Sequence, residues 1–278
     1  MQSFSSIAKR FGVSVTSIIR WFDNLNYPHP KLPECIAIDE LRGNAGGEKF
    51  QCNIADPVKH QVIDILPSRN TENLCKHFLE YPYKERAAVK KIIMDLSTLF
   101  RSVAKSMFAE AKIVADKFHV IRVVINSLEN VRKRIQKEFH ATKRKWFKRS
   151  RYLLLKPEYK LTSEDKTELA RMLNSSYDLE KAYVLKERFY EVFRKQTRTE
   201  AKKELGKWLL LAADLSLPEF RHCITTFSNW KTEIANIIGE RVSNGFIEGS
   251  NNKIKVLKRI SYGVQNFDRF RNRILYLQ

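Results

Sequence analysis

The chain has 278 residues, 43% of them hydrophobic and 11% aromatic, which is enough to build a sizeable folded core. Its 51 Lys and Arg residues outnumber 31 Asp and Glu residues, giving a net charge of +20 that indicates a polyanionic partner, first of all nucleic acid. No apolar run reaches the roughly 20 residues that span a bilayer, and no signal-peptide pattern opens the sequence, so we expect a cytoplasmic protein with no membrane partner. The four cysteines are scattered without a CxxC pair, which disfavours a zinc ribbon or a disulfide framework and favours buried thiols.

Residues 1–30 form a predicted DNA-binding segment. Apolar residues at helical spacing indicate two short helices, over 5–11 and 14–22, with Gly12 between them. The spacing of Ala8, Gly12 and Ile18 is that of a helix-turn-helix, in which the second helix enters a DNA groove, although an ordinary αα-hairpin has the same pattern. The side chains expected to face the groove are Ser14, Thr16, Ser17 and Arg20.

Residues 31–120 are predicted to form an α/β sheet region. Apolar runs over 33–40, 50–56 and 61–66, separated by turn residues, indicate three antiparallel strands. They are followed by a predicted helix over 71–78, a strand over 89–94, a helix over 96–108 and a strand over 111–115. Three strands, a helix, a strand, a helix and a strand is the order of a ribonuclease-H-like fold.

Two aspartates end apolar runs of this region: Asp39 after the first strand and Asp95 after the strand over 89–94. Open sheets place active residues at the carboxyl ends of strands, so the two side chains are expected close enough to share divalent cations. Either aspartate alone is more often a turn or cap residue. With Glu248, which lies among small and amide residues near the C-terminus, they predict a Mg²⁺ site, because neighbouring carboxylates repel unless a cation neutralises them.

The segment 243–255 is predicted to be a helix that Ser243 caps. Its two glycines each cost roughly 1 kcal/mol relative to alanine in a helix, so they make sense where a nucleic-acid backbone comes close. One face of this helix carries Glu248, Asn251, Asn252 and Lys255. Basic residues here and in an arginine-rich helix over 267–275 are expected to hold phosphates: Lys253, Lys255, Lys258, Arg259, Arg269 and Arg271.

Residues 121–240 read as a largely helical insertion between the second aspartate and the glutamate. A long amphipathic helix over 121–139 runs into a stretch where basic residues alternate with aromatics. This pattern suits phosphate contact and base stacking, and it fits equally a solvated helix end with a core-facing tryptophan. The residues concerned are Lys143, Arg144, Lys145, Trp146, Lys148 and Arg149. Further helices are expected over 177–193, 200–211 and 218–238.

Four motifs together resemble those of the bacterial insertion-sequence DDE transposases of the ISL3 group. The motifs are Ala37-Ile38-Asp39-Glu40, Met94-Asp95-Leu96-Ser97, Ala115-Asp116-Lys117-Phe118-His119-Val120, and the segment 243–255 with the arginine-rich tail after it. The similarity covers nearly the whole chain. It implies a ribonuclease-H-like catalytic core interrupted by a mostly α-helical insertion and preceded by a helix-turn-helix. The implied parts are 1–30, the helix-turn-helix; 31–120, the first part of the core; 121–240, the insertion; and 241–278, the last part of the core.

The resemblance also implies an activity: metal-dependent cleavage of DNA strands at transposon ends, and strand transfer. Asp39, Asp95 and Glu248 match the catalytic, metal-binding triad, with two Mg²⁺ ions as cofactor and Mn²⁺ as a substitute. Asp116 and His119 match a D-x-x-H element that either supports the site or is purely structural, and Asn252 is a further supporting residue. The implied partners are double-stranded DNA, as terminal inverted repeats and target, and by analogy a second copy in a synaptic homodimer. Nucleoid association when bound to DNA would follow.

The sequence departs from the family at its start. Family members usually begin with a cysteine-rich zinc-binding segment, and nothing of that kind precedes Met1, which implies a shortened form or an internal start. Two rival functions fit the same residues. One is a structure-selective nuclease or resolvase on the same fold. The other is a helix-turn-helix DNA-binding protein, or an inactive transposase remnant, that competes at transposon ends.

Overall fold

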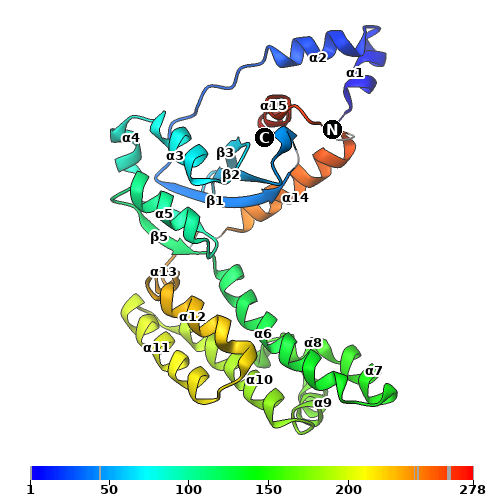
Figure 1. The fold of residues 1–278 in the computed structure, drawn as a ribbon, viewed down its shortest axis with the longest axis vertical. Helices are drawn as coiled ribbons and strands as arrows, with labels where there is room; N and C mark the ends of the chain where they lie inside the picture. The colour runs from blue at the N-terminus through cyan, green and yellow to red at the C-terminus, as the bar shows by residue number, and fades with distance from the viewer. Residues whose placement is uncertain (1, 44, 241, 243, 262–263, 278) are drawn as a thin grey trace. The chain divides into compact units, whose positions relative to one another are not determined.

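The computed structural model describes residues 2–43, 45–240, 242, 244–261 and 264–277 (Figure 1). The chain forms two compact units, one of residues 1–114 and 241–278 and one of residues 115–240. Within the described residues, no helix is both long enough and apolar enough to cross a membrane. The elements of the first unit are α1 (Phe4–Phe11), α2 (Val15–Asp23), β1 (Cys35–Arg42), η1 (Ala45–Gly47), β2 (Phe50–Asp56), β3 (Gln61–Leu66), α3 (Thr71–Leu79), α4 (Tyr83–Ala88), β4 (Lys91–Met94), α5 (Thr98–Met107), β5 (Lys112–Ala115, which reaches the boundary), α14 (Gly245–Ile260) and α15 (Phe267–Tyr276).

The first unit is built on a five-stranded mixed sheet of order β3-β2-β1-β4-β5. The first three strands form the predicted antiparallel meander, and β4 lies parallel to β1 on its other side. The strand predicted over 89–94 begins later, at Lys91, because the short helix α4 precedes it and ends at Ala88, with Val89 as its C-cap. This helix went unrecognised in the sequence, although its residues after Pro82 are mostly good helix formers.

The helices α14 and α15 bury their apolar residues against the meander. The cluster that joins them to the sheet includes Leu41 of β1 and Val62 and Ile65 of β3. The β2–β3 register shifts between Ile54 and Ala55, which allows Val62 and Ile65 to enter one cluster despite their odd spacing. On the helices its members are Ile254, Leu257, Phe270 and Ile274. The far C-terminal residues are therefore part of the same core as the first strands.

The N-terminal helices α1 and α2 form a short helical hairpin. Ser3 and Ser14 cap them through hydrogen bonds from the amides of Ser6 and Ser17, and Gly12 makes the turn at φ 65°. Ala8 and Ile18 are buried between the helices, as their spacing predicted. An αα-hairpin at this position is therefore confirmed, and its role in binding DNA remains a prediction.

The second unit is helical in its described residues. Its main elements are α6 (Lys117–Lys137), α7 (Ala141–Arg149), α8 (Arg151–Leu155), α9 (Ser163–Leu173), α10 (Tyr177–Tyr190), α11 (Arg198–Asp214), α12 (Arg221–Asn229) and α13 (Lys231–Ala235), with short 3-10 turns at Glu158–Lys160, Glu191–Arg194 and Pro218–Phe220. Helix α6 starts four residues before the predicted Ile121, because Asp116 caps it. The helix predicted over 218–238 is broken at Trp230, which separates α12 from α13. Trp208 and Trp230 are buried core residues.

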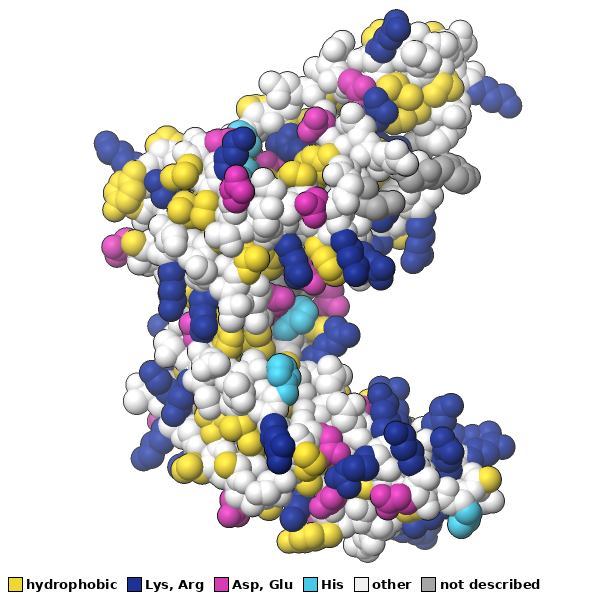
Figure 2. Space-filling view, in the orientation of Figure 1, with side chains coloured by type: hydrophobic (Ala, Val, Ile, Leu, Met, Phe, Trp, Pro, Cys, Tyr) yellow, Lys and Arg dark blue, Asp and Glu magenta, His cyan; other side chains and the backbone are white. Residues whose placement is uncertain are grey.

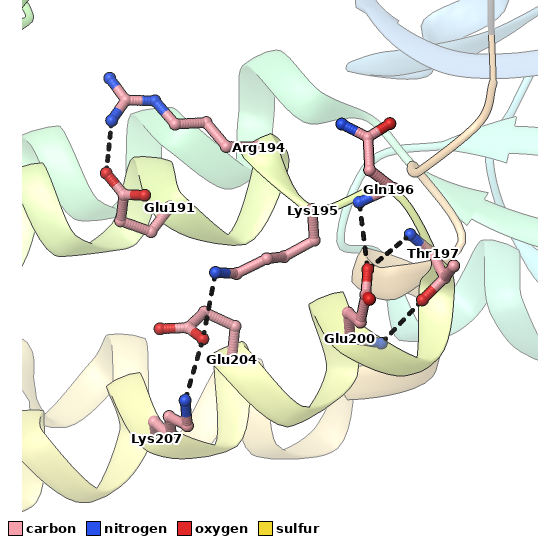
Figure 3. A network of polar contacts seen from close by, with 8 residues as sticks. All are labelled: Glu191, Arg194, Lys195, Gln196, Thr197, Glu200, Glu204 and Lys207. Carbon is pink, nitrogen blue, oxygen red and sulfur yellow. Dashed lines mark hydrogen bonds and ion pairs between the residues drawn. The ribbon is translucent and has the colours of Figure 1, made fainter.

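Charges pair with one another around the start of α11 (Figure 3). Thr197 and Glu200 form a capping box, and the Glu200 carboxylate also accepts from the amide of Gln196. These backbone bonds lower the pKa of Glu200. Glu204 lies 3.4 Å from the Lys195 Nζ and 3.3 Å from the Lys207 Nζ. This part of the unit stabilises its own helix and is a poor candidate for phosphate contact.

Candidate active site

Asp39 lies within β1, which continues past the predicted end of the strand to Arg42, and Asp95 directly follows β4, the parallel neighbour of β1. In the register of β1 and β4, Ile38 pairs with Met94, so the next residue along each segment is one of the aspartates. Neighbouring strands run about 4.8 Å apart, so the two side chains leave adjacent points of the backbone. The register places the two aspartates on neighbouring segments, and their sharing of a divalent cation stays a prediction.

Helix α14 is joined to Asp39 by a chain of side-chain amides. Asn251 donates from Nδ2 to Oδ2 of Asp39 at 2.8 Å, and its Oδ1 accepts from Nδ2 of Asn53 at 2.8 Å. Asn53 stands opposite Asp39 in the β1–β2 register. The other Asp39 oxygen, Oδ1, accepts from the amide of Glu40 at 2.8 Å. Asp39, Asn53 and Asn251 are 8%, 0% and 5% exposed, so this network fixes the rotation of α14 against the sheet in a buried setting.

Sequence reasoning did not find this network. It put Asn251 and Asn252 on one face and named Asn252 as the supporting residue, whereas in the structure Asn251 makes the contact with Asp39 and Asn252 is exposed. Asn53 was not singled out at all. A polar residue in an otherwise buried strand was the available signal, because a buried amide needs a partner.

Glu248 lies in the first turn of α14, three residues before Asn251 and on the exposed side of the helix. Three residues correspond to a rise of about 4.5 Å, so Glu248 is one turn from the amide that binds Asp39. Within the described residues, the ligand oxygens of Asp39, Asp95 and Glu248 do not all lie within 4.8 Å of one another. The predicted cap Ser243 lies outside the described residues, and Asn244 is the residue before the helix.

The charge around β1 and β2 acts on the thiol of Cys52. Burial raises the pKa of this fully buried thiol well above its usual value, and the charges of Asp39, Asp95 and Glu40 raise it further. Negative charge is thus concentrated where the two strands carry their carboxylates. The available donors are hard oxygen atoms, which suit Mg²⁺ or Mn²⁺ better than ions that prefer nitrogen or sulfur. The donor atoms of Asp39, Asp95 and Glu248 are thus of the type that suits Mg²⁺, and the ion itself stays a prediction.

Asp116 and His119 belong to the second unit and have a local role. Asp116 accepts from the amide of Phe118 at 3.3 Å, so it caps α6, and its Oδ2 lies 2.5 Å from Nδ1 of His119. Asp116 is 6% exposed. Asp116 is thus the N-cap of α6 and His119 is its partner, and a supporting role of the pair in the site stays a prediction.

An open basic groove lies in the first unit, between the end of β1 and the later turns of α14. Two of its residues, Arg42 and Lys49, were not singled out in the sequence. Glu48 is its one acidic side chain among the lining residues described. The groove is lined by Arg42, Gly43, Gly47, Glu48, Lys49, Lys255, Lys258 and Arg259. Its charge suits a phosphate backbone that passes along the same helix that carries Glu248.

The remaining predicted DNA contacts fall into two exposed groups. In α2, Thr16 and Arg20 are exposed, while Ser14 and Ser17 are bonded to each other at the helix cap. In α7, Trp146 is half-buried and donates to Glu168, and the neighbouring Phe147 is the residue of the core. Lys and Arg side chains gather over the α7 region (Figure 2). Those on the helix are Lys143, Arg144, Lys145, Lys148 and Arg149.

Two C-terminal arginines bind carboxylates of their own unit. Arg269 holds Asp23 of α2 with bonds of 2.8 and 2.6 Å, and Arg271 holds the buried Asp64 with bonds of 2.5 and 3.1 Å. Both were predicted to hold phosphates. In the structure their guanidiniums already have anionic partners, and they attach α15 to α2 and β3. Lys253 and Lys255 remain exposed on α14.

Comparison with protein families gives one model that covers most of the chain. Residues 36–274 match the ISL3-group DDE family whose description is "Transposase". That range contains β1 from its second residue, the other four strands, the helical unit, and α14 with most of α15.

Curated relatives carry the same description. Over 241 residues the chain is 25% identical to the transposase for insertion sequence element IS1001 of Bordetella parapertussis, covering 85% of this chain and 59% of the relative. Over 254 residues it is 27% identical to the transposase for IS1557 of Mycobacterium tuberculosis, covering 83% and 57%. The chain thus spans less than three-fifths of the length of these relatives. A 94-residue stretch is 35% identical to a Lactococcus lactis protein named ATP-dependent protease, but covers only 34% of this chain and 26% of that protein.

Proposed function

Because the chain belongs to the transposase family of the ISL3 group, we propose that it is a DDE transposase that cuts strands at insertion-sequence ends and joins them to target DNA. We assign its sheet unit to the ribonuclease-H-like class and Asp39, Asp95 and Glu248 to the catalytic triad. The observation that carries the proposal is the β1–β4 register, in which Asp39 and Asp95 follow paired residues while Asn251 of the Glu248 helix binds Asp39.

Mg²⁺, with Mn²⁺ as a substitute, fits this oxygen-rich set, and the three carboxylates are the residues that would hold it. When bound, the ions supply Lewis-acid chemistry that activates water or a DNA 3′-hydroxyl and stabilises the leaving oxygen of the scissile phosphate. Asn251 keeps the Asp39 carboxylate fixed beside Asp95. Glu248 is exposed on the same helix, one turn before Asn251, and is proposed to complete the set of carboxylates.

The DNA backbone is proposed to follow the basic groove. Arg42 and Lys49 on one wall and Lys255, Lys258 and Arg259 on the other would pair with successive phosphates. The groove shares α14 with Glu248, so a duplex held there runs toward the triad. We assign recognition of the terminal repeat to the α1–α2 hairpin and further phosphate contact to α7. A homodimer that pairs two transposon ends is part of the proposal by analogy.

Replacing Lys255 and Lys258 by alanine should weaken binding to duplexes of any sequence. Binding releases the counterions of each phosphate that a lysine neutralises. For every such contact that is lost, the slope of the logarithm of the binding constant against the logarithm of the salt concentration should become shallower by about 0.9. Fluorescence anisotropy with a labelled duplex over a salt series measures this slope. The control is Lys84→Ala, which removes an exposed lysine of α4. If the slope of the double variant equals that of the wild type, the groove does not hold DNA.

Gly249 tests whether DNA comes close to α14. A Cβ built at Gly249 meets no other atom within 4 Å, so Gly249→Ala should stabilise the free protein by about 0.5–1 kcal/mol. If a DNA backbone fills that space, the same change should weaken binding and cleavage. Urea unfolding and duplex binding measure the two effects. The control is Gly206→Ala in α11, where the added atom meets only the flexible end of Lys231. If Gly249→Ala binds the duplex as tightly as the wild type does, the DNA backbone does not come close to α14 at this residue.

Strand transfer separates the proposal from its rivals. Duplexes that carry the inverted repeats flanking the gene, incubated with Mg²⁺ and a target plasmid, should be nicked at their ends and joined to the plasmid. A structure-selective nuclease or resolvase would cut branched DNA without joining it. A DNA-binding remnant would hold the ends without turnover in Mg²⁺ or Mn²⁺. Either of those results contradicts the transposase proposal.

A further inference from the structure

A second cluster of metal-ligating side chains lies away from the two aspartates. His29, in the segment between α2 and β1, meets His77 and Glu80 at the end of α3. One ligand atom of each lies within 4.8 Å of those of the other two, and within the described residues no other set of three His, Cys, Asp or Glu side chains is gathered in this way. No motif in the sequence joins these residues.

His77 is the buried member of the cluster, so its side chain is held in place by the surrounding core. It is 6% exposed, and its Nε2 is buried with no hydrogen-bond partner among the described residues. Its other nitrogen, Nδ1, faces Asp64 Oδ2 at 3.7 Å. A histidine that turns one nitrogen toward a carboxylate and leaves the other without a partner has the arrangement of a metal-bound histidine with its supporting carboxylate. A buried nitrogen without a partner is otherwise a cost to the fold.

The other two ligands are able to move. The side chains of His29 and Glu80 are 40% and 48% exposed, and Nε2 of His29 lies 2.9 Å from Oε2 of Glu80. A tetrahedral ion with bonds near 2.1 Å needs ligand atoms about 3.4 Å apart, so small rotations of these two side chains would complete the set around the fixed His77. The hydroxyl of Tyr81, whose ring lies 5.6 Å from that of His77, is also buried with no partner among the described residues.

We propose that His29, His77 and Glu80 bind one Zn²⁺ ion, or a similar transition-metal ion, as a site distinct from the Mg²⁺ site. Two imidazoles and one carboxylate are a common zinc donor set that leaves a fourth position for water. Imidazole nitrogen suits Zn²⁺ much better than Mg²⁺.

The position of the cluster gives the site a structural role. His29 lies in the segment that leads from the α1–α2 hairpin to the sheet, and α3 follows the last strand of the meander. The same segment is held by the Leu32 amide, which donates to Glu85 at 3.2 Å. A bound ion would therefore attach the segment behind the hairpin to α3, and should raise the stability of the whole unit.

Co²⁺ titration of untagged protein in excess Mg²⁺ tests the site. A tetrahedral Co²⁺ ion absorbs strongly in the visible, and we expect one such ion per chain, displaced by Zn²⁺. His29→Gln and Glu80→Gln should each weaken Co²⁺ binding by about 100-fold or more, because each removes one metal ligand. Both side chains are partly exposed, so neither change should disturb the fold. His222→Gln, which changes an exposed histidine of α12, is the matched control and should bind as the wild type does.

A further variant, Glu248→Gln, distinguishes the proposed Zn²⁺ site from the proposed Mg²⁺ site. Glu248→Gln should keep the Co²⁺ spectrum and the Zn²⁺-dependent rise in melting temperature, while His29→Gln should lose both. The zinc proposal is overturned if His29→Gln binds Co²⁺ like the wild type, or if binding disappears in Glu248→Gln. It is also overturned if no tetrahedral spectrum appears. None of these readouts depends on transposase activity, so failure here leaves the proposed function untouched.

Discussion

Glu248→Gln should reduce metal-dependent nicking of an insertion-sequence end by about three orders of magnitude or more, while duplex binding stays within about twofold. The amide keeps the size of the side chain but removes the charge that would help to hold the divalent ion. Glu248 is exposed, so its replacement should leave the fold intact. Nicking of a labelled duplex in Mg²⁺, together with binding of the same duplex in Ca²⁺, measures the two quantities.

The control for this variant is Asp268→Asn, which removes an exposed carboxylate from the first turn of α15 in the same unit. It should nick at close to the wild-type rate. Asp39→Asn and Asp95→Asn should be as inactive as Glu248→Gln, and combining them should add little, because the three residues act as one unit. Full nicking by Glu248→Gln would exclude this residue from the chemistry.

Asn251→Ala should destabilise the protein by about 2–4 kcal/mol. The change leaves the Nδ2 donor of Asn53 with only its 3.4 Å bond to Ser250, and it takes the Asn251 donor away from Asp39. Asp39 loses the bond that fixes its Oδ2, so nicking should also fall, by about 100-fold for a displacement near 1 Å. Urea unfolding gives the stability change, and nicking at saturating Mg²⁺ gives the activity.

Asn252→Ala is the matched control for stability. The neighbouring amide is exposed, so its removal should change the free energy of unfolding by less than about 0.5 kcal/mol. If Asn252 supports the site as predicted from the sequence, this variant loses activity without losing stability. Equal destabilisation by the two variants would show that the buried amide network does not hold α14 to the sheet.

The sheet and its two aspartates could be predicted because their signals are local. Each apolar run ends in a carboxylate, and strands that run parallel place such ends side by side, so Asp39 and Asp95 needed no knowledge of the rest of the chain. Glu248 was proposed through its motif. The start of α6 and the whole of α4 were missed for a local reason as well. Asp116 and Pro82 precede these helices as N-caps, and hydrophobic spacing does not reveal such residues.

Contacts between distant segments could not be predicted. Choosing Asn251 over Asn252 depends on the rotation of α14, which is set by its packing on the meander. The pairing of Arg271 with Asp64 likewise depends on where α15 lies. His29, His77 and Glu80 come from an irregular segment and one helix end, with no spacing pattern to join them. Side chains of this kind become neighbours only when the core is assembled.

The most direct measurement of the triad is a crystal structure of the protein bound to an insertion-sequence end duplex in Mn²⁺, with anomalous scattering used to locate the ions. The account predicts manganese within about 2.2 Å of carboxylate oxygens from Asp39, Asp95 and Glu248, next to the scissile phosphate. Manganese held without Glu248, or Glu248 apart from the aspartates with DNA in place, would contradict it.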